Sequence, residues 1–172
     1  MHETYIETYF LTATIYSWKD ILESDRYKDI IIDSLRFLFE NNKIKVFAFV
    51  IMPNHIHIIM HICEGSSTSS VQGSLLRFSA NQMRKKLIED DKKYLERFKV
   101  EKKDREYQFW KRNPLWIPVY SEKVFEQKLN YIHNNPVKAE LVDRHEEYYY
   151  SSYRFYKEGI DEFGFLINGY EL

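Results

Sequence analysis

With 172 residues and 44% hydrophobic content, the chain is long enough to bury a core, and we expect a single domain over residues 1–172. Its net charge of −1 excludes a polycation, and its one cysteine, Cys63, excludes a disulfide framework. The start lacks the pattern of a signal peptide, and the longest fully apolar run, at 46–52, is too short to cross a bilayer. We therefore expect a cytoplasmic protein without membrane contact.

The predicted elements follow the order strand, helix, strand, strand, helix, strand, and then a further helix. Aromatic and β-branched residues predict the strands, and apolar residues at helical spacing predict the helices. The predicted ranges are 8–18, 25–41, 44–52, 55–62, 71–93 and 115–120, with the last helix beginning after Ser121 and interrupted at Pro136. The charged stretch 89–106 fits either a frayed helix extension or a mobile arm.

This order is that of an α+β, ferredoxin-like (split βαβ) domain. Only Pro53 and Asn54 separate strands 44–52 and 55–62, so these two strands form a hairpin and the helices act as crossovers. We expect a four-stranded antiparallel sheet with helices on one face and an extra C-terminal helix. Many functions use this fold, so the fold alone does not identify the activity.

The charge is distributed unevenly along the chain. Residues 84–113 hold twelve Lys or Arg against seven Asp or Glu, whereas residues 139–172 hold three against eight. From about residue 146 the tail is both aromatic and acidic. A near-neutral total can therefore conceal a basic binding face, although a solvated surface explains such charges equally well.

Two histidines, His55 and His57, stand in the apolar run VIMPNHIHII. Alternation along a strand places both on one face with Cα atoms about 6.5–7 Å apart, so both rings could bind one metal ion. Buried carbonyls or carboxylates satisfy such histidines equally well, and a metal site needs a third ligand. His61 shares the face but lies about 13 Å along the strand, which is too far for the same ion.

The stretch LNYIHNNPVKAELV places Tyr131 and Asn135 one helical turn apart. A tyrosine aimed at a metal-bound phosphate can act as a nucleophile and store the bond energy as a phosphotyrosine. Judged by numbers alone, Tyr131 is better explained as one of 14 tyrosines packed against the sheet. Asn135 could equally be the N-cap of a new short helix that starts at Pro136. The residues alone leave these alternatives open.

Three segments together resemble the HUH single-strand DNA transposases, and among them most closely the REP-associated tyrosine transposases of the IS200-like family. These segments are VFAFVIMPNHIHIIMHI, FWKRNPLWIPVYSEKVFEQKLNYIHNNPVKAELV and YYYSSYRFY. The resemblance runs from the first strand to about residue 156. Its most specific parts are the His-hydrophobic-His strand and the downstream tyrosine. It departs from the family motif at Ala139-Glu140, where the motif has Ala-Gly.

The resemblance implies that His55, His57 and Asn135 bind a divalent cation and that Tyr131 is the nucleophile. Mg²⁺ or Mn²⁺ suits such a site better than Zn²⁺, because phosphate and water oxygens would complete the coordination. The implied reaction is metal-dependent cleavage and rejoining of single-stranded DNA at hairpins through a 5′-phosphotyrosine. The implied enzyme is a transposase, mobile or domesticated, acting as a monomer or homodimer.

DNA binding would draw on phosphate contacts and base stacking from the basic stretch. The candidates close the second helix or precede the fourth strand, and they are Arg84, Lys85, Lys86, Trp110, Lys111 and Arg112. A solvated surface and an ordinary core tryptophan explain the same residues equally well.

Two other functions stay open. A catalytically silent, nucleic-acid-binding ferredoxin-like module would use exposed aromatic residues on the sheet, but it leaves the histidine pair unexplained. A tandem-histidine phosphoesterase would need two separated His-x-Ser/Thr motifs, and the chain does not contain two. The phosphoesterase is therefore the weaker alternative.

Overall fold

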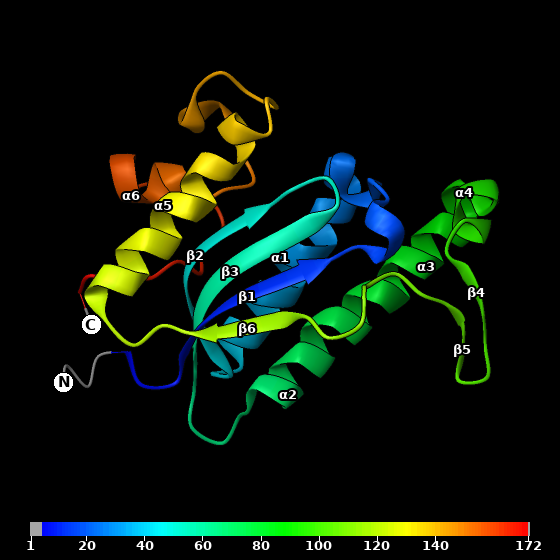
Figure 1. The fold of residues 1–172 in the computed structure, drawn as a ribbon, viewed down its shortest axis with the longest axis horizontal. Helices are drawn as coiled ribbons and strands as arrows, with labels where there is room; N and C mark the ends of the chain where they lie inside the picture. The colour runs from blue at the N-terminus through cyan, green and yellow to red at the C-terminus, as the bar shows by residue number, and fades with distance from the viewer. Residues whose placement is uncertain (1–4, 172) are drawn as a thin grey trace.

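The computed structural model describes residues 5–171, and a four-stranded antiparallel sheet lies at its centre (Figure 1). The strands lie in the order β2-β3-β1-β6, and their bounds are β1 Thr8–Thr14, β2 Ile44–Ile51, β3 His55–Ile62 and β6 Leu115–Pro118. All neighbouring strands pair antiparallel, and β2 and β3 form the expected hairpin. The predicted ferredoxin-like arrangement is confirmed.

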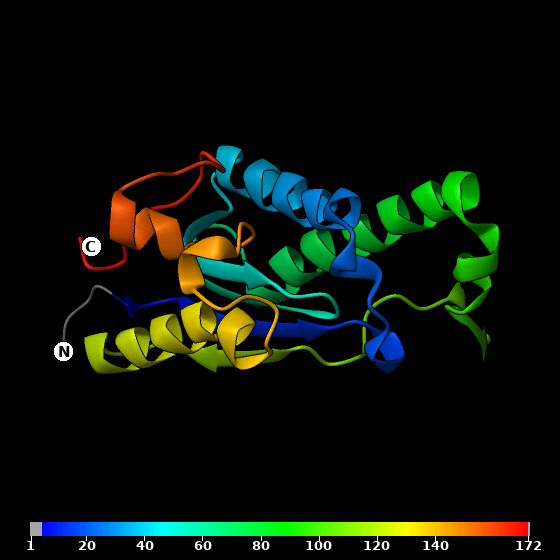
Figure 2. The ribbon, with the colours of Figure 1, turned by 90° about the horizontal axis from the view of Figure 1, so that it is seen from above.

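Helices cover both faces of this sheet (Figure 2). One face carries the two crossover segments, and the other carries the helix that follows β6. The crossover helices are α1 Asp25–Glu40, α2 Thr68–Gln72 and α3 Phe78–Asp90, with a π-helical turn at Gly73–Arg77 between α2 and α3. The helix on the opposite face is α5, Glu122–Lys138, which carries Tyr131.

Alternation along β3 supplies two separate hydrophobic cores. Ile58 and Met60 enter the core beneath α1 and α3, whereas Ile59 points to the other face and packs in the core beneath α5. His55 and His57 have the same parity as Ile59, so they lie on the α5 face. The position of α5 therefore decides which groups the two histidines meet.

The first strand is shorter than predicted. β1 ends at Thr14, and a 3₁₀ turn at Tyr16–Trp18 follows, with a second one at Ile21–Glu23. Ser17 and Trp18 both have a positive φ of 54°. This left-handed backbone is uncommon outside glycine and cannot continue a strand, although the aromatic and β-branched composition favoured one.

The ambiguous stretch 89–106 forms regular structure that neither expectation foresaw. It contains the short helix α4, Lys92–Glu96, followed by a two-stranded hairpin of β4, Lys99–Lys102, and β5, Arg105–Tyr107. Figure 1 shows this hairpin projecting at the end of α3, away from the central sheet.

The prediction that Pro136 interrupts the last helix was wrong. Proline lacks an N–H group and crowds the carbonyl four residues earlier, which usually breaks a helix. Here α5 continues to Lys138, and Pro136 is buried inside it. The Ser121 side chain caps the start of α5. Apolar side chains along the helix pack in the core between α5 and the sheet. Asn135 consequently stays helical, one turn beyond Tyr131.

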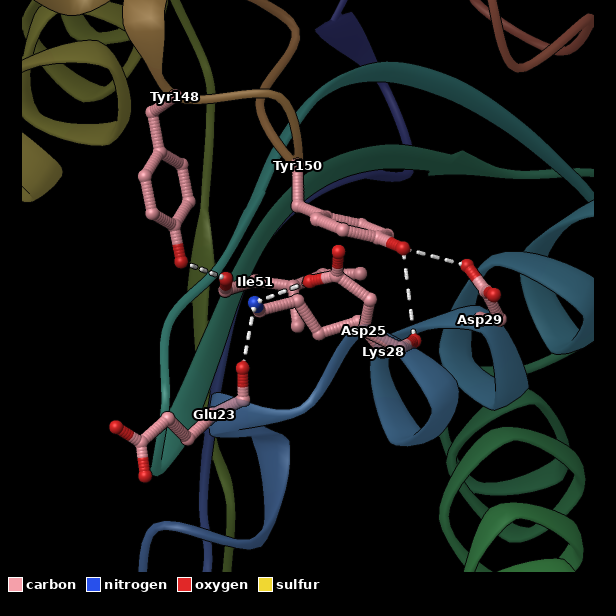
Figure 3. Close-up of polar contacts among 7 residues, drawn as sticks. All are labelled: Glu23, Asp25, Lys28, Asp29, Ile51, Tyr148 and Tyr150. Carbon is pink, nitrogen blue, oxygen red and sulfur yellow. Dashed lines mark hydrogen bonds and ion pairs between the residues drawn. The ribbon is translucent and has the colours of Figure 1, made fainter.

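The acidic, aromatic tail packs against α1 and the end of β2 (Figure 3). It includes a 3₁₀ turn at His145–Glu147 and the short helix α6, Tyr153–Glu158. The Tyr148 hydroxyl donates to the Ile51 carbonyl at 2.7 Å, and the Tyr150 hydroxyl donates to the Asp29 carboxylate at 2.7 Å. Burial raises the pKa of both phenols, so both remain protonated donors.

The same tail covers the outer edge of β2. The backbone N–H of Ile51 donates to Tyr150 O, that of Ser152 to Phe49 O, and that of Ile167 to Val46 O, each at 3.0 Å. An edge strand with its backbone groups paired cannot add a strand from another molecule. None of the helices among residues 5–171 has the length and apolar character needed to cross a membrane.

Candidate active site

The two histidines of β3 converge as their spacing predicts. Their ring centroids are 4.9 Å apart, and His57 is only 4% exposed. The Phe10 ring of β1 stacks on the imidazole of His57 with centroids 5.3 Å apart. The pair is thus half enclosed by the sheet and open toward α5.

Neighbouring side chains hold one nitrogen of each imidazole. Asn54 donates its amide N–H to the Asp20 carboxylate at 2.8 Å, so its oxygen faces His55 and accepts from Nδ1 at 2.8 Å. The Thr12 hydroxyl lies 2.8 Å from Nδ1 of His57. Such partners fix the ring orientation of metal-binding histidines and leave Nε2 to point at the ion.

The remaining nitrogen of His57 has no partner. Its Nε2 atom is buried without any hydrogen bond, one of three such side-chain atoms among residues 5–171. A buried polar atom of this kind usually finds a partner, so an orphan needs an explanation. Burial, with added repulsion from His55 and Lys128, lowers the pKa of His57 to about 3. The imidazole is therefore neutral, and in the tautomer whose Nδ1–H donates to Thr12 the lone pair lies on Nε2, where a cation can bind it.

Helix α5 brings Tyr131 to the same place. The Tyr131 ring centroid lies 5.1 Å from that of His57, and the side chain is 47% exposed. Asn135 follows one turn later, and its side chain opposes the lowering of the pKa of His55 that burial causes. The neighbouring face of α5 is buried against the sheet through Phe125, Leu129 and Ile132, which fixes the helix rotation.

A pocket of about 430 Å³ opens between these groups and is the candidate active site. Its lining includes Thr12, His55, His57, Tyr131, Asn135 and Lys138. Among the described residues no three His, Cys, Asp or Glu side chains come together as a metal cluster. The two imidazoles and the Asn135 amide oxygen are the donors that could hold an ion here. The orphaned Nε2 of His57 fits such a group.

Two lysines of α5 flank Tyr131, and the sequence predictions missed both. Lys128 and Lys138 stand three residues before and seven residues after Tyr131, so helical geometry places them on the same face. Lys128 Nζ lies 4.8 Å above the Phe10 ring, and Lys138 lines the pocket. The spacing Lys128–Tyr131–Asn135–Lys138 could have revealed this stripe, had the helix been expected to pass Pro136.

The predicted DNA-binding residues lie in two places. Arg84, Lys85 and Lys86 belong to α3, which covers the face of the sheet opposite α5 (Figure 2). Arg84 lies 3.7 Å from the Glu106 carboxylate and stacks over the Tyr107 ring at 5.1 Å. These three residues are therefore not part of the pocket.

The second predicted group follows β5. Trp110 is 8% exposed and donates its indole N–H to Ser79, so its ring belongs to the core. Arg112 pairs with Asp104 at 3.2 Å. Lys111 is exposed, and its backbone N–H donates to Thr14, a residue that lines the pocket. Of the six predicted residues, Lys111 is the one whose backbone is hydrogen-bonded to a residue that lines the pocket.

Comparisons with known proteins agree on one group of enzymes. The model of the family described as "Transposase IS200 like" matches residues 7–135, a range that contains both histidines, Tyr131 and Asn135. No curated protein matches the chain. The structure of a REP-associated tyrosine transposase bound to a REP hairpin matches with a TM-score of 0.65 and 18% identity, over 95% of this chain and 87% of that chain.

A second solved structure, of a protein from Deinococcus radiodurans R1 assigned as a transposase, gives a TM-score of 0.50. It shares 19% identity over 74% of this chain and 88% of that chain. At such identities the two structures establish a shared fold. Together with the family match, they account for the sheet and for the helix that carries Tyr131.

Proposed function

This chain belongs to the IS200-like transposase family, and we propose that it cleaves and rejoins single-stranded DNA with Tyr131 as its nucleophile. The observation that carries the proposal is the pairing of Tyr131 with the neutral His57, whose buried Nε2 has no protein partner. A nucleophile beside a buried imidazole nitrogen of this kind suits phosphoryl transfer at a metal-bound phosphate.

His55, His57 and Asn135 would hold the metal ion. Mg²⁺ or Mn²⁺ bound there would polarise the scissile phosphate and offset the charge that develops on its oxygens. Asp20, Asn54 and Thr12 support this role, because they orient the imidazoles through Nδ1 and leave both Nε2 atoms for the ion.

Tyr131 would form the covalent bond to DNA. Its phenolic oxygen attacks phosphorus, the bond from phosphorus to the 3′ oxygen breaks, and the 3′ oxygen leaves as a hydroxyl with the proton that the phenol lost. The product is a 5′-phosphotyrosine and a free 3′ end. Attack by a 3′ hydroxyl on the phosphotyrosine reverses these bonds and rejoins a strand without ATP.

Lys128 and Lys138 would bind the DNA backbone on either side of Tyr131. Both are cations on the face of α5 that borders the pocket. Phosphate binding by lysine is electrostatic and independent of base sequence, which suits residues that hold a strand across the nucleophile.

The substrate we propose is single-stranded DNA with a hairpin. One similar structure is described as bound to a REP hairpin, and its fold matches 95% of this chain. The projecting β4–β5 hairpin and the basic residues Arg84, Lys85 and Lys86 on the far face could contact a duplex stem, but the nucleophile itself would meet the single strand.

The test is a covalent adduct assay. The protein is incubated with Mn²⁺ and labelled single-stranded hairpins from the flanks of its own gene, then resolved on a denaturing gel. We expect a protein band shifted by DNA that requires metal and is lost in Tyr131→Phe. Tyr120→Phe, which alters a tyrosine that is 72% exposed and lies outside the pocket, serves as the matched control and keeps the band.

If the DNA binds but no variant, metal or flanking hairpin yields a covalent band, the protein is instead a silent nucleic-acid-binding module. In that case the histidine pair would need another explanation.

A further inference from the structure

An exposed tryptophan separates the active-site pocket from a second pocket. Trp18 is 59% exposed, and its ring centroid lies 6.2 Å from that of His55, edge to face. It lines the active-site pocket and also a neighbouring pocket of about 450 Å³, here called the Trp18 pocket. A large apolar ring left in water at this boundary has no role in the core and none in the mechanism described above.

The walls of the Trp18 pocket are aromatic and charged. Tyr27 and Tyr94 line it together with Lys19, Asp20, Glu23 and Arg97. The Arg97 guanidinium stacks over the Tyr94 ring at 5.0 Å, which presents a flat cationic surface. Rings and guanidinium planes are the surfaces on which single-stranded bases stack. The carboxylates of Asp20 and Glu23 repel a phosphate but accept hydrogen bonds from a base edge.

The Trp18 pocket is connected to the metal-binding histidine by hydrogen bonds. Asp20 on its wall accepts from Asn54, and Asn54 accepts from Nδ1 of His55. The backbone N–H of Leu22 donates to Pro53 O at 2.9 Å, and that of Ile15 donates to Asn54 O at 2.8 Å. These hydrogen bonds join the turn that carries Trp18 to the turn that precedes His55, so they set the position of a group bound on Trp18 relative to the reacting phosphate.

We propose that the Trp18 pocket binds one nucleobase of the single-stranded DNA next to the scissile phosphate, stacked on Trp18. The proposal rests on the function proposed above, since it concerns the same DNA strand. The base is held at the pocket while its phosphate enters the active site, and the Asp20–Asn54–His55 chain keeps the two in register. The left-handed backbone of Ser17 and Trp18, both at φ 54°, is what turns the indole out to this position.

The experiment is a double-mutant cycle between Trp18 and the DNA. Fluorescence anisotropy measures binding of hairpin oligonucleotides from the gene's flanks to Tyr131→Phe protein, in which no cleavage can occur. Each nucleotide of the single-stranded part is replaced in turn by an abasic residue. We expect an abasic residue at one position to weaken DNA binding about tenfold. The same abasic residue should weaken binding little in protein that also carries Trp18→Ala.

Phe37→Ala is the matched control, because Phe37 is 61% exposed and lies on α1, outside both pockets. It should leave the pattern of abasic costs unchanged, and Trp18→Phe should restore most of the binding that Trp18→Ala loses. The proposal is overturned if no abasic position couples to Trp18, if the coupled position is not next to the cleavage site, or if Phe37→Ala weakens binding as much as Trp18→Ala.

This binding measurement does not depend on catalysis. If Trp18 couples to a base but the wild-type protein forms no adduct, the proposed base site is supported and the proposed tyrosine nuclease activity is overturned. If the adduct forms and no base couples to Trp18, the nuclease activity is supported and the proposed base site is overturned.

Discussion

The unpaired nitrogen of His57 lowers the stability of the folded protein, and a bound ligand would remove this cost. Its Nε2 is buried without a partner, and leaving such an atom unpaired costs about 1–3 kcal/mol. The same residue stacks on Phe10 and bonds to Thr12, so its position is fixed while this one atom is left unsatisfied. Local costs of this kind are typical of functional sites.

The first prediction concerns this residue. His57→Leu removes the unpaired nitrogen and also the bond to Thr12, and these two effects oppose each other, so the free energy of unfolding of the metal-free protein should change by less than about 1 kcal/mol, while Mn²⁺ binding is lost. Urea denaturation and calorimetric titration with Mn²⁺ measure the two effects.

The matched control is His61→Leu. His61 lies on the same face of β3 and bonds to the Ile6 carbonyl at 3.0 Å, so this change should leave Mn²⁺ binding intact. A clear loss of stability in metal-free His57→Leu would show that His57 is a structural residue.

The second prediction concerns the lysines of α5. If Lys128 and Lys138 each neutralise one phosphate, Lys128→Gln and Lys138→Gln should each reduce the salt dependence of single-strand binding by about 0.7 in the slope of log K against log salt. Anisotropy at several salt concentrations measures that slope. Lys123→Gln, on the same helix but outside the stripe, should leave the slope unchanged, and equal slopes in all three variants would exclude the phosphate contacts.

At the scale of elements, the sequence predicted the sheet and the histidine spacing because strand alternation is a local property. His55, His57 and Ile59 share a face whatever packs against it. The side on which α5 lies is a tertiary property, and no single segment encodes it. Tyr131 could therefore be placed near the histidines only by resemblance to a family.

The errors have identifiable physical causes. Pro136 opposes helix locally, but its burial, the packing of α5 through Phe125, Leu129 and Ile132, and the cap at Ser121 outweigh that tendency, so α5 continues. Trp18 was assigned to a strand because aromatic residues favour strands, whereas a left-handed backbone turns it outward. Trp110 has the aromatic ring that base stacking requires, but this ring is buried in the core, where its N–H is hydrogen-bonded to Ser79.

The third prediction concerns the junction of α5 with the tail. The Ser152 hydroxyl is fully buried, accepts from the backbone N–H of Phe49 at 3.1 Å and lies 2.9 Å from Nε2 of His133 in α5. Ser152→Ala leaves these groups unpaired and should lower the free energy of unfolding by about 1–3 kcal/mol. It should also slow adduct formation, because His133 is two residues from Tyr131.

Chemical denaturation and the rate of adduct formation measure the two effects. Ser69→Ala, at an exposed position of α2, is the control and should change neither. An unchanged denaturation midpoint in Ser152→Ala would mean that the tail does not anchor α5.

At the scale of the whole molecule, the candidate site is assembled within one chain. Tyr131 lies beside His57 of its own sheet, and the tail covers the outer edge of β2. The fourth prediction follows. Co-expressed Tyr131→Phe and His57→Leu chains should not recover the covalent adduct, because each active site takes Tyr131 and His57 from the same chain and neither variant chain has both. Recovery of the adduct would show that the tyrosine acts on the metal site of a partner chain.

The covered edge of β2 also has a consequence for folding during translation. The partner that satisfies the Phe49 backbone stands 103 residues further along the chain. A ribosome needs about 5–20 s to add that many residues, and during this interval the strand edge has no cover of its own. Nascent chains on neighbouring ribosomes could pair through it. A chaperone that binds open strand edges should therefore raise the fraction of protein recovered as single folded chains, whereas slower translation lengthens the interval and should lower that fraction.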